Sequence, residues 1–262
     1  MLILGYLAAM LIGISLGLIG GGGSILTVPV LVYIFHLEPT NATTYSLFIV
    51  GLTSLIGAIG YLKRKQINLP VALLYASSSI FTVLATRRLL LPFIPDHIFS
   101  IGAVNITKSM LTMLLFALLM ILASVSMIRN GHATVSDEKV VKPDYFRTAL
   151  YGVAIGFITG LLGAGGGFLI IPALIMLMKM PMKEAVGTSL LIIALNSLLG
   201  FAGDVAFVHI EWTFLIAISA VAAIGIVLGT RMSKRIAGAQ LKKGFGWFVL
   251  MMGIYIFAAE LL

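Results

Sequence analysis

A glycine-rich motif occurs twice in this chain, and it limits what the apolar sequence around it can form. The first copy covers residues 20–24, and the second covers residues 163–167, which lie 143 positions further on. Glycine has a low helix propensity and a permissive backbone, so we expect an apolar helix to break at each copy. In a membrane, broken backbone is tolerated only where it is buried in protein or lines a wet cavity. Two such breaks at matching positions indicate the binding site of a transporter.

The surrounding composition places both breaks in an integral membrane protein. Of the 262 residues, 60% are hydrophobic and 10% are charged, whereas soluble domains contain about 25% charged residues. There is no cysteine, and the four histidines have no metal-ligand spacing, so we expect no disulfide, metal or cofactor. The net charge of +8 is typical of cytoplasmic loops in such a protein and does not indicate binding to nucleic acid.

The residues that an enzyme or an ATP-driven pump would need are missing from this sequence. Histidines and acidic residues are few and scattered, and no Gly-Lys-Ser or Gly-Lys-Thr follows either glycine cluster. Without that lysine there is no phosphate-binding loop. We therefore expect no enzymatic activity, and we expect transport to use a gradient or simple conduction.

Apolar runs predict an all-α polytopic membrane protein made of two repeats. The first repeat covers residues 1–128, a polar cytoplasmic linker covers 129–145, and the second repeat covers 146–262. In each repeat, a pair of short helices interrupted by glycines is followed by three transmembrane helices of bilayer-crossing length. The expected segments are 4–19, 24–35, 42–62, 69–86 and 98–128, followed by 146–162, 167–178, 183–203, 211–230 and 241–261.

The two repeats match each other in sequence. Residues 13–60 align without gaps on residues 156–203, and the identical positions are mostly glycine, serine and proline. The match resumes where Thr86 and Arg87 align with Thr230 and Arg231. Such identities are not explained by apolar composition alone, so the sequence indicates an internal duplication.

The distribution of basic residues predicts that the repeats are inverted. If each glycine-interrupted pair were one crossing, lysines and arginines would divide almost evenly between the two faces of the membrane. If each pair enters the membrane and returns, nearly all of them share one face, as cytoplasmic loops do. The second arrangement places both termini outside and makes the repeats enter from opposite faces, which is a transporter architecture.

The backbone around the two breaks is the first candidate binding site. A helix is expected to begin after each break, and a helix N-terminus presents unpaired N–H groups and about half a positive charge. Two such ends would hold an oxyanion without a formal cation. The alternative is that the glycines only allow close helix packing. The predicted binding residues are Gly21, Gly22, Gly23, Ser24, Ala164, Gly165, Gly166 and Gly167.

Small polar side chains on the third segment of each repeat are the second candidate. Ser46 and Ser54 align with Ser189 and Ser197, and Thr53 aligns with Asn196. Hydroxyl and amide groups donate hydrogen bonds that an oxyanion can accept. We predict that Ser46, Ser54, Ser189 and Asn196 complete the binding site. The alternative is that they form hydrogen bonds between helices.

Three cationic residues are candidates for gating or for attracting an anion. Arg87 and Arg231 align at the ends of the fourth segments, and Lys108 lies within the fifth segment of the first repeat. Ionisable residues inside membrane spans are functional candidates. The alternative is that they reach the membrane surface and fix the topology.

Both glycine-rich copies resemble the TauE/SafE sulfite exporter family. The resemblance is carried by residues 17–29 and 160–172, each followed by a span with Ser46 or Ser189, and by Thr230 and Arg231. It covers essentially the whole chain. The resemblance implies a multi-pass protein of the bacterial or archaeal plasma (inner) membrane that exports sulfite or a related sulfur-containing anion such as sulfoacetate.

The sequence thus predicts a secondary transporter that exports sulfite or a related sulfur-containing oxyanion, a small inorganic or organosulfur anion, through the lipid bilayer. An anion channel and a non-transporting assembly or scaffold subunit are the alternatives left open. The coupling ion and the oligomeric state, including a homo-oligomer, are also left open.

Overall fold

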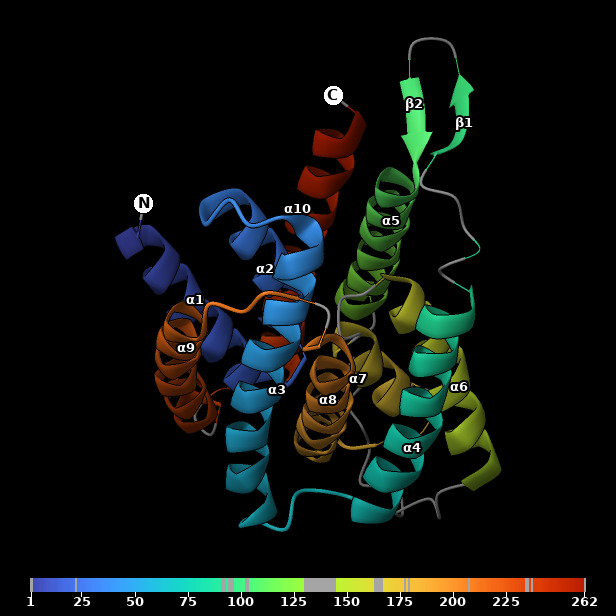
Figure 1. Ribbon diagram of the computed structural model, residues 1–262. Coiled ribbons are helices and arrows are strands. Elements are labelled where there is room, and N and C mark those ends of the chain that lie inside the picture. Colours follow the sequence, from blue (N-terminus) through green and yellow to red (C-terminus); the bar gives the residue numbers. More distant parts are fainter. Residues whose placement is uncertain are drawn as a thin grey trace.

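The computed structural model is built almost entirely of helices (Figure 1). It describes residues 2–261 except 22, 91–92, 94–96, 102–103, 130–144, 163–166, 177, 179, 207, 234–235 and 237. The first repeat contains α1 (Leu2–Ile19), α2 (Gly23–Pro29), the π-helix η1 (Val30–Ile34), α3 (Pro39–Leu62), α4 (Leu69–Ala85), the π-helix η2 (Thr86–Leu90) and α5 (Lys108–Arg129). The second repeat contains α6 (Tyr145–Leu162), α7 (Gly167–Met176), α8 (Met182–Asp204), α9 (Trp212–Met232) and α10 (Gly238–Leu261).

The lengths of the apolar helices agree with a multi-pass membrane protein. Among the described residues, three helices are long and apolar enough to cross a bilayer, namely Asn41–Leu62, Met182–Asp204 and Trp212–Met232. Shorter apolar helices surround them, including Ile3–Ile19 and Leu69–Ala85. These helices fall where the apolar runs predict segments. The predicted linker between the repeats lies almost wholly outside the described residues.

The expected helix over residues 98–128 is wrong in its first part. Strands β1 (His97–Ile101) and β2 (Val104–Thr107) form an antiparallel hairpin in which Phe99 pairs with Ile106, and α5 begins only at Lys108. β-branched and aromatic residues are frequent in both strands, and such residues favour extended structure. The whole run as one helix would also far exceed the about 20 residues that cross a bilayer. Over the residues that the structure describes, the fold is therefore helical with one β-hairpin, and Lys108 stands at a helix start.

The chain reverses direction at the first glycine break. Beyond the break, the Cα of Gly23 lies against the carbonyl of Ile12 and the side chain of Leu16, so α2 runs back along α1. At the far end of η1, the ring of Phe35 packs edge-on against Tyr6 near the start of α1, with a centroid separation of 6.4 Å. The segments flanking this break thus form a hairpin.

Helices from one repeat pack mainly on helices from the other. The first helix of each repeat packs on the fourth-segment helix of the other repeat: α1 lies along α9, and α6 lies along α4 (Figure 1). The two helices that follow the glycine hairpins, α3 and α8, pack on each other, and so do α5 and α10. Exchanging the two repeats leaves this set of pairings unchanged. The helices of the two repeats therefore pack against each other and bury a shared hydrophobic core.

Glycines allow the exchanged helix pairs to approach closely. A Cβ on Gly13 of α1 would overlap the carbonyl of Ala222 in α9, and one on Gly225 would overlap the carbonyl of Met10. In the equivalent pair, a Cβ on Gly156 of α6 would lie 2.7 Å from the carbonyl oxygen of Ser79 in α4. Small residues permit such backbone contact between membrane helices. The packing alternative thus holds for these glycines, which lie outside the two breaks.

Two hydrogen bonds between the repeats occupy equivalent positions. The Asn68 N–H, at the start of α4, donates to Thr188 Oγ1 in α8 at 3.0 Å. The Glu211 N–H, at the start of α9, donates to Tyr45 Oη in α3 at 2.6 Å. Asn68 aligns with Glu211, and Tyr45 aligns with Thr188, in the register of the duplication. Each bond therefore ties one end of a helix to the opposite repeat.

Replacing Thr188 by valine should lower the free energy of unfolding by about 1 kcal/mol, because the Asn68 N–H loses its acceptor while the side-chain shape is kept. Thr82→Val is the matched control, since the Thr82 hydroxyl only donates to the carbonyl of Ser78 in its own helix. Chemical unfolding of both variants in detergent, followed by circular dichroism, measures the difference. Equal midpoints for the two variants would contradict the assignment.

Candidate functional site at the glycine breaks

Gly20 ends α1 in a conformation that favours glycine. Its φ angle is +85°, and its N–H donates to the carbonyl of Leu16 at 2.7 Å. A glycine in the left-handed region is a common helix terminator because other residues meet a steric penalty there. A Cβ on Gly20 would also lie 2.8 Å from Ser189 Oγ of α8. The break therefore sits directly beside a predicted binding residue of the other repeat.

The starts of α2 and α7 lie against each other. A Cβ on Gly21 would overlap the carbonyl of Gly167, the first residue of α7. A Cβ on Gly167 would lie 2.8 Å from Ser24 Oγ and 2.9 Å from Ile193 Cδ1 of α8. The two backbones can be this close only because no side chain separates them. The structure thus brings together Gly21, Gly23, Ser24, Gly167 and Ser189 from three helices and both repeats.

The serine hydroxyls at this junction are buried and bonded within their own segments. Ser24 Oγ donates to the carbonyl of Gly21 at 2.7 Å, and Ser189 Oγ donates to the carbonyl of Val186 at 2.9 Å. A hydroxyl has one hydrogen and two lone pairs. Each serine must therefore rotate its hydroxyl before it can donate to an anion, whereas the first N–H groups of a helix have no partner within that helix.

The remaining predicted residues are placed differently. Asn196 Nδ2 donates to Ser79 Oγ of α4 at 2.8 Å, which is a hydrogen bond between helices. Ser46 and Ser54 are buried in α3, 4% and 0% exposed, and no contact among the described residues places either of them at the Gly21–Gly167 junction. Gly22, Ala164, Gly165 and Gly166 lie outside the described residues, so their predicted roles stay predictions.

Arg231 is the predicted cation whose side chain the structure describes. It is exposed in the last turn of α9. It follows Thr230, whose backbone nitrogen would lie 2.7 Å from a Cβ on Gly17, just before the first break. Arg87 lies in η2, and Lys108 is the first residue of α5. In the described part of the chain, no three metal-ligating side chains converge.

Sequence reasoning missed two polar residues of the interior, Tyr75 and Ser219. Among the described residues, four buried side-chain hydroxyls have no hydrogen-bond partner: Ser54, Tyr75, Ser197 and Ser219. Ser54 and Ser197 are equivalent in the duplication, whereas Tyr75 aligns with Ile218 in the register that pairs Asn68 with Glu211. Tyr75 and Ser219 stand in apolar runs, where sequence shows that a polar residue is present but not which neighbour it faces.

Comparison with known proteins identifies relatives over nearly the whole length. The profile of the family described as "Sulfite exporter TauE/SafE" matches residues 5–256. A "Probable membrane transporter protein" of Xylella fastidiosa (strain 9a5c) is 30% identical over 252 residues, covering 94% of this chain and 91% of the relative. The "Probable membrane transporter protein YunE" of Bacillus subtilis is 28% identical, covering 83% of each chain.

An archaeal relative extends the comparison. A "Probable membrane transporter protein" of Methanocaldococcus jannaschii is 28% identical over 260 residues, covering 94% of this chain and 91% of the relative. No solved structure matches significantly. The resemblance stated from the two glycine motifs is confirmed by the family match. The chain therefore belongs to the sulfite exporter TauE/SafE family of membrane transporters.

Proposed function

We propose that this protein is a secondary transporter that exports sulfite or a related sulfur-containing oxyanion, and that the anion binds between the two glycine breaks. The observation that carries the proposal is the contact of Gly21 with Gly167, which brings the first turns of α2 and α7 together in the interior. Unpaired N–H groups and the positive ends of two helices favour an anion there. The family name supports sulfite as the first substrate to test.

The predicted roles of the individual residues belong to this proposal. Backbone N–H groups of residues 21–24 and 164–167 would contact the anion, and Ser189, next to Gly20, would donate after its hydroxyl rotates. Ser46, Ser54 and Asn196 would donate when the helices rearrange, and Asn196 would first leave Ser79. Arg87, Arg231 and Lys108 would attract anions towards the site.

Alternating access follows from the proposed inverted repeats. The contacts of α1 with α9 and of α6 with α4 exchange when the repeats are exchanged, and this supports a two-fold relation between them. We expect the two repeats, 1–128 and 146–262, to rock against each other around the anion. The linker 129–145 and the basic loops would face the cytoplasm, and both termini would lie outside the plasma membrane.

Export agrees with the electrical gradient of a cell. The interior potential is negative, and an anion gains about 2.3 kcal/mol per charge for each 100 mV when it leaves. Net outward movement therefore needs no coupling ion. A bound anion between neutral donors would be released once the site opens to the outside.

Uptake of labelled sulfite into proteoliposomes containing the full chain tests the proposal. We expect saturable uptake with counterflow, and competition by the sulfur oxyanion methanesulfonate that exceeds competition by chloride. A single-channel current would identify an anion channel instead. Folded protein that moves no sulfur oxyanion would overturn the proposed substrate, and if it moves no anion at all, a scaffold role would take its place.

A further inference from the structure

The phenol of Tyr75 is a buried donor whose hydrogen-bond partner is missing. Tyr75 lies in α4 and is 0% exposed, and its Oη has no partner. A buried hydroxyl without a partner is costly, and the great majority of buried polar groups are paired. Phenylalanine would fill the same space in the closely packed contact between α4 and α6, yet the chain has a tyrosine at this position. This observation points to a partner that is bound during function.

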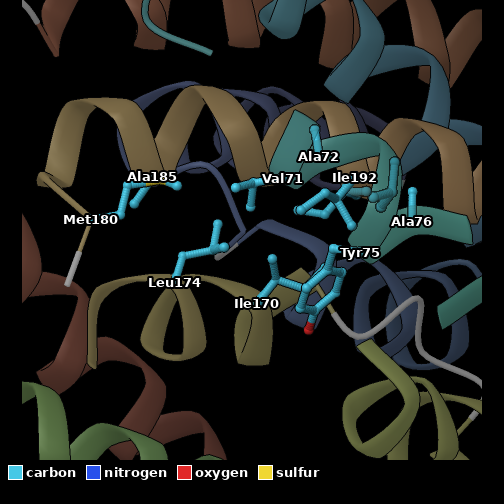
Figure 2. Packing of buried hydrophobic residues seen from close by; sticks show 11 residues of the cluster. Val71, Ala72, Tyr75, Ala76, Ile170, Leu174, Met180, Ala185 and Ile192 are labelled. Carbon is cyan, nitrogen blue, oxygen red and sulfur yellow. The ribbon is translucent and has the colours of Figure 1, made fainter. Parts of the chain in front are cut away.

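The Tyr75 side chain is directed towards the beginning of α7. Figure 2 shows its ring extending from α4 and lying beside Ile170, in the first turn of α7. That helix runs for 10 residues from Gly167 to Met176. Its first N–H groups have no intrahelical partners, and its N-terminus carries about half a positive charge. The ring of Tyr75 thus lies beside the helix whose start contacts Ser24 and Gly21 (Figure 2).

Two further neutral polar groups lie near Tyr75. Ser79 follows it by one turn on the same face of α4, and Ser79 Oγ accepts from Asn196 Nδ2 at 2.8 Å. The remaining members of this cluster are apolar, including Val71, Leu174 and Ile192. Among the residues whose burial the structure describes, no lysine, arginine or histidine is buried. The described polar groups beside Tyr75, from Ser79 and Asn196, therefore offer hydrogen bonds without a formal charge.

The equivalent positions of the other repeat are mostly apolar. In the register that pairs Asn68 with Glu211, Ile218 stands in place of Tyr75, and Ala222 stands in place of Ser79. Thr53 stands in place of Asn196, and its hydroxyl donates to the carbonyl of Ile49 in its own helix at 2.6 Å. A long donor and an amide are thus present only on the α4–α8 side. The duplication has diverged at the residues that could contact a ligand beside α7.

We infer that Tyr75 Oη donates a hydrogen bond to the transported oxyanion beside the start of α7, and that this neutral set of donors selects singly charged oxyanions over doubly charged ones. The inference rests on the proposed function, which it makes more specific. Burying a charge away from water is costly unless it is compensated. Neutral donors and one helix terminus compensate a single charge better than two. Hydrogensulfite and methanesulfonate carry one charge, whereas sulfate carries two.

The test measures binding and stability of the purified full chain, with methanesulfonate and sulfate as probes of similar shape. Wild type should bind methanesulfonate at least about ten-fold more tightly than sulfate. Tyr75→Phe should weaken methanesulfonate binding by about ten-fold or more, since a hydrogen bond to a charged group is lost. The melting temperature of the ligand-free variant should stay equal or rise, because an unpaired hydroxyl has been removed. Tyr255→Phe is the control, since Tyr255 is exposed on α10.

Each outcome separates this inference from the proposed function. Sulfite flux by wild type together with unchanged binding by Tyr75→Phe would overturn the role of Tyr75 and leave the proposed function standing. If wild type binds sulfate as tightly as methanesulfonate, the proposed selection of singly charged oxyanions is overturned. This comparison needs no variant. A ligand-free Tyr75→Phe variant that melts well below wild type would show that the hydroxyl is a structural group. Wild type that neither binds nor moves any sulfur oxyanion would overturn the proposed function itself.

Discussion

Replacing Gly21 by alanine is expected to reduce anion flux by at least about ten-fold, the largest loss of activity that we anticipate from adding one methyl group. The new Cβ would overlap the carbonyl of Gly167. Both atoms are fixed to the backbone, so neither can rotate away from the overlap as the end of a flexible side chain could. The starts of α2 and α7 must then move apart. Donors that are displaced by even about 1 Å lose much of their effect on a bound group. Proteoliposome flux of the folded variant, compared with wild type at equal protein density, measures the loss.

The matched control for this prediction is Gly60→Ala. Gly60 lies in α3, and a Cβ there would meet no atom within 4 Å. The same chemical change should therefore leave flux unchanged and should favour the helix by about 0.5–1 kcal/mol. If Gly21→Ala transports as well as Gly60→Ala, the contact of the two breaks does not hold the anion. If Gly21→Ala fails to fold while Gly60→Ala folds, the breaks act in packing, as the alternative reading of the glycines requires.

Leucine at Gly13 or at Gly156 should produce the largest loss of stability, about 3 kcal/mol or more for each variant. Gly13 faces the carbonyl of Ala222 in α9, and Gly156 faces the backbone of Ser79 in α4. An added side chain must separate helices that touch through their backbones, and overpacking of this kind costs about 1–3 kcal/mol even where neighbours can adjust. Thermal unfolding in detergent and the yield of monodisperse protein measure the effect.

The two variants also test the internal duplication as a structural relation. Gly13 and Gly156 are equivalent positions in the alignment of the repeats, so their losses should agree within about 1 kcal/mol. Gly244→Leu in α10 is the control of equal size, because no atom lies within 4 Å of a Cβ at that position. Wild-type stability of Gly13→Leu would show that α1 does not pack on α9 as the structure has it.

Much of the helical framework could be predicted because it depends on properties of single segments. Long apolar runs without charge predict helices, and they fall at α3, α8 and α9 as expected. The glycine clusters predicted the end of α1, since Gly20 adopts a positive φ there. The one segment predicted wrongly, residues 98–107, is also apolar, and hydrophobicity does not distinguish a strand from a helix in such a run. Its β-branched residues were the available signal.

The candidate site could be predicted only in part. The alignment of the repeats indicated Ser189, which lies beside Gly20. It also indicated Asn196, but the bond from Asn196 to Ser79 depends on how α8 lies along α4. Tyr75 gave no signal, because one tyrosine in an apolar helix is ordinary until its hydroxyl proves to be buried without a partner. Roles in binding stay proposals for all of these residues.

The sequence by itself determined that this protein is a helical membrane protein whose first helix ends at a glycine cluster, and it indicated an internal duplication. Those properties follow from hydrophobicity and backbone freedom, which act along the chain. Only the tertiary structure decided that α1 packs on α9, that α6 packs on α4, and that Gly21 lies against Gly167. These contacts join residues that are far apart in the chain, and they depend on which helix faces fit together without a gap.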